Sequence, residues 1–143
     1  MEYIILDNEW NTSYKKINGK CFNELIEIGA VKLDSKLREI SRFSVLIKST
    51  FTKKLSSRFQ RLTNITTEEM NSKGVTFSQA VALYSEWAGT EAVTLTWSNS
   101  DLYVLLENFR LRQFLKQQDI LHEPSLNLKQ LENRILLNLK NLI

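Results

Sequence analysis

The chain has 143 residues, a net charge of +3, 43% hydrophobic residues and 24% charged residues, a composition ordinary for a single globular domain. It contains no run of 18 apolar residues, which excludes a membrane-spanning segment, and its acidic start "MEYIILDNEW" does not have the basic segment of a signal peptide. Cys21 is the only cysteine and cannot form an internal disulfide, so a reducing, cytoplasmic location is the simplest expectation.

The first third of the chain is predicted to consist of β-strands. Residues 3–7 form an unbroken apolar run typical of a buried strand, and residues 25–33 form a second strand of the same kind. Residues 40–48 alternate, as expected for a strand with one face in water. The short connections between these segments favour antiparallel pairing.

Helices are predicted to follow. Thr66 with Glu69, and Thr76 with Gln79, have the spacing of a capping box at a helix start, and Gly89 ends the second helix. The remaining predictions are a strand at 92–97, a helix at 100–117, a short strand at 125–129 and a helix at 130–141. No linker divides the chain, so residues 1–143 are expected to form one α/β domain.

Two carboxylates stand at the end of the first strand. Side chains two apart on a strand point to the same face, so Asp7 and Glu9 project together. Such a pair repels and is costly to desolvate unless a cation neutralises it, and oxygen ligands suit Mg²⁺ or Mn²⁺. A solvated strand edge would give the same pattern.

A third acid follows the strand at 92–97. Asp101 stands at the start of the next helix. Neighbouring parallel strands deliver their carboxyl ends to one crevice, so Asp7, Glu9 and Asp101 are predicted to meet at one metal site. An acid in the first turn of a helix is also favoured by the helix dipole without any metal.

Basic residues occur in groups that would suit a polyanion held near bound metal, although solvated faces would look the same. The groups are Lys15, Lys16 and Lys20; Lys53, Lys54, Arg58 and Arg61; and Arg110, Arg112 and Lys116.

Several segments resemble a known family when read in order. They are "YIILDNEW", "FNELIEIGAVKLD", "LTNITTEEM", "TFSQAVALYSEWAG" and "TWSNSDLYVLLENF", and the resemblance that they mark runs in order through nearly all of residues 3–130. The chain is similar to the DEDDh 3′–5′ exonucleases of the DnaQ-like superfamily, in particular to the branch that holds RNase T, the ERI-type enzymes and KapD-like proteins.

The resemblance implies a ribonuclease H-like fold, with a mixed sheet of three antiparallel strands continued by parallel ones and with flanking helices. It also implies that the partner is the 3′ end of a single-stranded nucleic acid, hydrolysed with two divalent ions about 3.5–4 Å apart. By position, Asp7 would bridge both metals, Glu9 would complete the first site and Asp101 would serve the second. Glu27 matches a family glutamate, which we interpret as structural and not as a ligand.

The same resemblance suggests two residues for substrate binding. Trp10 could stack on the terminal base, although core packing would also explain it. The backbone at Trp10 and Asn11 is a plausible contact to the 3′-terminal sugar.

The family's third motif, His-x-Ala-x-x-Asp, is not found in the sequence. His122 is followed five residues later by Asn127, and Pro124 would break the helix that the motif needs. The general base and the fourth acidic ligand are therefore missing from residues 1–143. We expect a C-terminally truncated exonuclease domain that lacks its last helix and is inactive or weak, with exposed apolar surface that a homodimer or a partner could cover.

Two other classes of function stay open. A nucleic-acid-binding module without catalysis would bind single strands in a salt-sensitive way. An interaction protein would dock through its exposed sheet and would not depend on the carboxylates.

Overall fold

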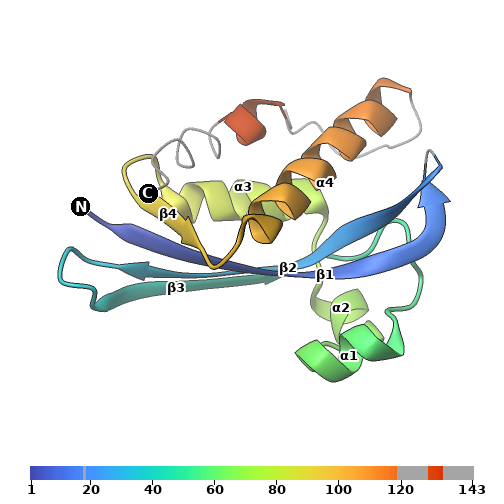
Figure 1. Ribbon diagram of the computed structural model, residues 1–143, viewed down its shortest axis with the longest axis horizontal. Coiled ribbons are helices and arrows are strands. Elements are labelled where there is room, and N and C mark those ends of the chain that lie inside the picture. Colours follow the sequence, from blue (N-terminus) through green and yellow to red (C-terminus); the bar gives the residue numbers. More distant parts are fainter. Residues whose placement is uncertain (18, 119–128, 134–143) are drawn as a thin grey trace.

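A computed structural model describes residues 1–17, 19–118 and 129–133 of the chain (Figure 1). The strands are β1 (Tyr3–Ile17), β2 (Lys20–Leu33), β3 (Glu39–Leu46) and β4 (Val93–Thr96). The helices are α1 (Ser57–Thr63), α2 (Thr67–Lys73), α3 (Phe77–Ala88) and α4 (Asn99–Gln117). Within these described residues, no helix is long and apolar enough to cross a membrane.

The four strands form one mixed sheet in the order β3-β2-β1-β4. β1 pairs antiparallel with β2, and β2 pairs antiparallel with β3. β1 and β4 are parallel, from Tyr3 opposite Val93 to Leu6 opposite Thr96. The predicted arrangement of three antiparallel strands continued by a parallel one is therefore confirmed.

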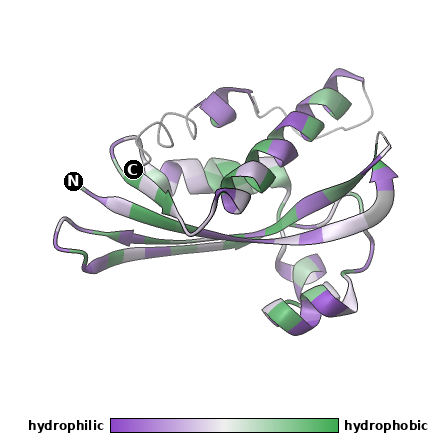
Figure 2. Ribbon diagram, in the orientation of Figure 1, coloured by the Kyte–Doolittle hydropathy of each residue, from purple (hydrophilic) through white to green (hydrophobic). Residues whose placement is uncertain are grey.

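Helices α3 and α4 cover one face of this sheet, whereas α1 and α2 lie on the other face near one end (Figure 1). We call the second face, opposite α3 and α4, the open face. Figure 2 shows hydrophobic and hydrophilic stretches along β1 and β2. Burial alternates from residue to residue along the apolar start of β1, so this strand presents one side to α3 and α4. Ile4 and Leu6 of β1 point to that side and are buried, while Ile5 between them is 44% exposed on the open face.

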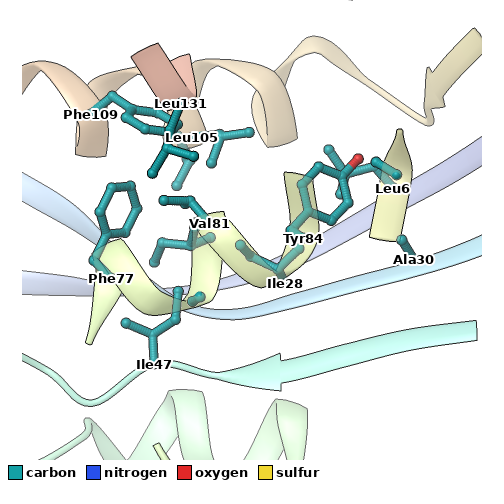
Figure 3. Close-up of a cluster of buried hydrophobic side chains, with 14 of the residues drawn as sticks. Leu6, Ile28, Ala30, Ile47, Phe77, Val81, Tyr84, Leu105, Phe109 and Leu131 are labelled. Atoms are coloured by element: carbon teal, nitrogen blue, oxygen red, sulfur yellow. The ribbon is translucent and has the colours of Figure 1, made fainter. Parts of the chain in front are cut away.

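The main core lies between the sheet and α3 and α4. Figure 3 shows α3 side chains, among them Phe77 and Val81, packed between the sheet and Leu105 and Phe109 of α4. The predicted capping box at Thr76 is present, since its hydroxyl accepts from the Gln79 N–H and the Gln79 side chain accepts from the Thr76 N–H. The cap fixes where α3 begins.

A smaller core packs α1 and α2 against the open face. It consists of Ile26, Leu55, Phe59, Ile65 and Met70. The sequence prediction missed α1, a seven-residue helix capped by Ser56. It correctly placed Thr66 as the N-cap of α2, but the Glu69 side chain reaches Lys73 (3.5 Å), so only half of that capping box is described.

Strand lengths also differ from the prediction. β1 continues to Ile17 and β2 begins at Lys20, so the two strands form a long hairpin instead of ending at residue 7 and starting at residue 25. Residues 129–133 are helical, and Leu131 joins the main core. The rest of the predicted strand at 125–129 and of the helix at 130–141 lies outside the described residues.

One of the predicted basic groups is divided by the fold. Arg112 of α4 is completely buried and pairs with the equally buried Glu24 of β2 at 3.3 Å. Its guanidinium also lies over the Phe77 ring, 4.5 Å from the ring centroid. Arg112 is therefore a structural cation and cannot contact a nucleic acid, whereas Arg110 and Lys116 are exposed.

Candidate functional site

Asp7 and Glu9 both project from the open face of β1, as the two-residue spacing predicts. Asp7 is exposed and Glu9 is half-buried. The residue opposite Asp7 on β2 is Gly29, and a Cβ at that position would lie 2.9 Å from the Asp7 carbonyl oxygen. Glycine therefore lets the two strands keep this register while leaving the face beside Asp7 open.

A β-bulge follows Glu9. The pairing with β2 steps from Glu9 opposite Glu27 to Trp10 opposite Leu25, which leaves Ile26 as the extra residue. Ile26 is buried against α1 and α2, and Glu27 faces the carboxylates of β1. Bulges re-aim side chains beside functional sites. Here the regular pairing that ends at the bulge places Glu27 directly opposite Glu9, where it is a fourth acid.

Asp101 reaches the same region from α4. Its Oδ1 accepts a hydrogen bond from the backbone N–H of Asn8 at 2.8 Å, and its carbonyl oxygen accepts from the Asn8 side-chain amide at 3.3 Å. The pairing of β1 with β4 ends at Leu6. Two residues later, at Asn8, Asp101 accepts the backbone hydrogen bond at this edge of β1. Asn8 lies between Asp7 and Glu9 in β1, and its two hydrogen bonds thereby connect this strand to the first turn of α4.

Three of these carboxyl groups have a raised pKa, and neighbouring carboxylates contribute to each increase. Burial raises the pKa of Glu9, and Asp7, Glu27 and Asp101 raise it further. Burial also raises the pKa of Asp101, with a further increase from Asp7 that the Asn8 N–H opposes. The pKa of Glu27 is raised by burial, then by Asp7 and then by Glu69.

The repulsion among these carboxylates favours the binding of a cation, but in the described residues their side chains are not already arranged as a set of metal ligands. Among the described residues, no three acidic, histidine or cysteine side chains are grouped so that they could hold a metal ion. The chemistry of the donors fits Mg²⁺ or Mn²⁺, because they are carboxylate oxygens whose mutual repulsion a hard cation would relieve. Asp7, Glu9 and Asp101 share one electrostatic environment, and their role as metal ligands stays a prediction.

A pocket of about 330 Å³ opens beside Glu9. Its lining comes from β1 and from the segment around α1: Glu9, Trp10, Thr12, Ser56, Arg58, Phe59, Leu62 and Thr63. Trp10 lies at this pocket and also packs against the main core, so both interpretations of Trp10 are compatible with its place. The sequence prediction missed the α1 side of the pocket, for which the Ser56 cap was the available signal.

Asn11 connects β1 to the start of α1 beside this pocket. Its side chain is 2% exposed, and its Oδ1 accepts from the backbone N–H of Ser56 at 3.2 Å. The amide therefore anchors the start of α1 to β1. The predicted sugar contact concerns the backbone of Trp10 and Asn11 and stays a prediction, and His122 lies outside the described residues.

The chain matches the family model described as "RNase_T: Exonuclease" over residues 5–136. No curated protein matches the chain in sequence.

Three solved structures illustrate the similarity of the fold. A full-length 3′-exonuclease is 22% identical with a TM-score of 0.66, covering 77% of this chain and 52% of its own. The nuclease domain of 3′hExo, a DEDDh family member bound to rAMP, is 22% identical with a TM-score of 0.63, over 87% of this chain and 62% of its own. E. coli Exonuclease I in complex with a dT13 oligonucleotide is 17% identical with a TM-score of 0.58, over 76% of this chain and 24% of its own. The chain thus spans about half to three-fifths of the first two proteins.

Proposed function

Because the chain belongs to the RNase T exonuclease family, we propose that it hydrolyses phosphodiester bonds of RNA or single-stranded DNA from the 3′ end with the help of Mg²⁺ or Mn²⁺. The observation that carries the proposal is that the charges of Asp7, Glu9 and Asp101 interact beside a pocket. A strand end bound in this pocket would bring its adjoining phosphate near Glu9, which fits exonucleolytic action.

Each residue has a role in this proposal. Asp7, Glu9 and Asp101 would hold two metal ions, and the chemistry that such ions would supply is activation of a water and stabilisation of the leaving oxygen. The Asn8 N–H keeps one oxygen of Asp101 in place, which leaves the other oxygen available as a ligand. Trp10 offers an aromatic surface to the terminal base, and the backbone at Trp10 and Asn11 contacts the terminal sugar.

We further propose that a polypeptide of residues 1–143 alone reacts slowly. The sequence supplies three of the expected acids, and no His-x-Ala-x-x-Asp segment occurs in it. Without a base whose pKa is near neutrality, the rate is expected to fall by about 10²–10⁴-fold.

The test uses single-stranded RNA and DNA oligonucleotides labelled at the 5′ end. Stepwise shortening from the 3′ end, dependent on Mg²⁺ or Mn²⁺ and absent in Asp7→Asn, supports the proposal. Internal cleavage, or cleavage that continues in Asp7→Asn, contradicts it. Cleavage at the rate of a complete family enzyme contradicts the slow-rate part alone.

A binding module without catalysis is the second candidate. It is favoured by the finding that the carboxylates in the described part of the chain do not form a ready metal cage. It predicts salt-sensitive binding of single strands with no metal-dependent shortening.

A further inference from the structure

The pocket beside Glu9 has one cation in its lining, Arg58 of α1. Its only acid is Glu9 itself, and the other lining residues are aromatic, aliphatic or hydroxyl-bearing. The same pocket therefore places one positive side chain near a group of negative ones.

Arg58 is exposed, and it differs from several other arginines of this chain in having no ion pair with a carboxylate among the described residues. Arg38, Arg42 and Arg112 each form an ion pair with a carboxylate. In the part of the chain that the structure describes, no carboxylate partner is found for Arg58, and its side chain is exposed at the pocket.

The hydroxyl groups of the pocket are already bonded within the protein. Ser56 Oγ accepts from the Phe59 N–H at 3.1 Å, and Thr63 Oγ1 donates to the Phe59 carbonyl at 2.8 Å. Thr12 Oγ1 donates to Asn23 at 2.8 Å. Ser56 can still donate its O–H and Trp10 its indole N–H, but the guanidinium of Arg58 is the only positively charged donor among the lining residues.

We propose that Arg58 binds a phosphate of the nucleic acid strand whose 3′ end occupies the pocket. The inference rests on the proposed function. A polyanion that approaches four interacting carboxylates is repelled, and a guanidinium at the rim offsets part of that repulsion. The planar fork of arginine also matches two oxygens of one phosphate, which a lysine cannot do.

The experiment measures binding separately from cleavage. A fluorescent single-stranded oligonucleotide with a non-hydrolysable 3′-terminal linkage is titrated in Mg²⁺ at several salt concentrations, and the anisotropy gives Kd. Arg58→Gln removes the charge, and Arg58→Lys keeps it without the fork. Arg61→Gln is the matched control, because Arg61 is an exposed arginine one turn further along α1 that does not line the pocket.

Arg58→Gln is expected to weaken binding about tenfold at low salt and to reduce the slope of log Kd against log salt by about one. Arg58→Lys is expected to recover part of this loss, and Arg61→Gln to change Kd less than about twofold. Equal losses in Arg58→Gln and Arg61→Gln would overturn the proposal, because the effect would then be one of general charge.

Three other outcomes also decide between the possibilities. A loss that occurs only with one terminal base and leaves the salt slope unchanged overturns the phosphate contact, because Arg58 would then read a base edge. If the wild-type chain binds no oligonucleotide, both this inference and the proposed function fail. If it binds and shortens ordinary oligonucleotides while Arg58→Gln does so equally well, the inference fails alone.

Discussion

The backbone N–H of Asn8 donates to Oδ1 of Asp101 at 2.8 Å, across 93 positions of the sequence. This bond joins the strand that carries two acids to the helix that carries the third. The position of Asp101 relative to Asp7 and Glu9 therefore depends on where α4 meets the free edge of β1.

The Asp101→Asn variant should remove the charge of this side chain while keeping its position in the fold. An asparagine can still accept the hydrogen bond from Asn8, so the fold should keep its stability, while metal-dependent cleavage falls on the order of 10²-fold or more because a charged ligand is lost. The raised pKa of Asp101 indicates that its charge costs the metal-free fold some stability, so a small gain is expected at neutral pH. Initial rates and thermal unfolding measure the two effects.

Glu107→Gln serves as the control, because Glu107 is an exposed acid on the same helix. It should change neither quantity appreciably. Full activity of Asp101→Asn would remove Asp101 from the metal site.

The stability of the metal-free protein should depend on pH through Glu9. The pKa of Glu9 is raised in the folded state, so the folded protein holds this proton more tightly than the unfolded chain does. Relative to the wild type, Glu9→Gln should therefore gain nothing below the ordinary pKa of 4.5, gain stability as the pH rises through and above it, and keep that gain at neutral pH. The gain should be below about 1 kcal/mol because Glu9 is partly exposed.

Chemical unfolding of both proteins at pH values from about 3.5 to about 7.5, in EDTA, would measure this difference on both sides of the ordinary carboxyl pKa. Mg²⁺ should then stabilise the wild type more than Glu9→Gln at neutral pH, because the ion relieves the repulsion that the substitution has already removed. A stability gain that grows toward low pH would contradict this prediction, because it would mean that folding lowers the pKa of Glu9.

The buried pair of Glu24 and Arg112 should be essential for stability. Arg112→Met is expected to cost about 3–5 kcal/mol, because it leaves the Glu24 carboxylate uncompensated in the interior. Glu24 also accepts from the backbone N–H of Thr50 at 2.7 Å, so the segment leading to α1 should loosen as well. Urea unfolding gives the free energy.

The exposed neighbour provides the comparison. Arg110→Met should change the free energy of unfolding by less than about 0.5 kcal/mol. The double variant Glu24→Gln, Arg112→Met should lose less unfolding free energy than the sum of the losses in the two single variants, because each single change leaves the other side chain buried without its charged partner. Simple additivity would mean that the two side chains are not coupled.

Gly29→Ala should disturb Asp7 without touching a carboxylate. The added methyl would lie 2.9 Å from the Asp7 carbonyl oxygen, so β1 or β2 has to shift. A loss of about 1–3 kcal/mol is expected, together with a lower cleavage rate. Ser44→Ala is the control, since Ser44 is the exposed partner of Gly29 on β3. Equal behaviour of the two variants would show that the sheet absorbs the methyl easily.

The sequence predicted the strands whose patterns are set by burial against α3 and α4. The apolar run of β1 ends at Leu6. The start of β2 also lacks a buried apolar pattern, because Lys20 and Cys21 are exposed. The outer hairpin is largely polar, so its pairing is fixed by the partner strand and by the turn at Gly19, which has a positive φ of 78°. Local pattern carries little information about such a segment.

The candidate site was predictable where it rests on strand geometry. Asp7 and Glu9 share a face because of the period of two, and Asp101 follows the strand next to β1. The α1 side of the pocket was not predictable in the same way, because this short helix buries only Phe59 and has no periodic apolar stripe. The burial of Arg112 was also hidden, because its carboxylate partner Glu24 lies 88 positions away.

The stretch from Asp7 to Asn11 leaves little freedom for change in its length. Within it, the Asn8 side chain reaches α4, whereas Asp7 and Glu9 point to the open face and Asn11 anchors α1 on that face. A single inserted or deleted residue just ahead of Asp7 would exchange the two sides of the strand and turn both acids toward the hydrocarbon interior. Libraries of random insertions should therefore recover many folded clones at the turn of residues 34–38 and none at this stretch.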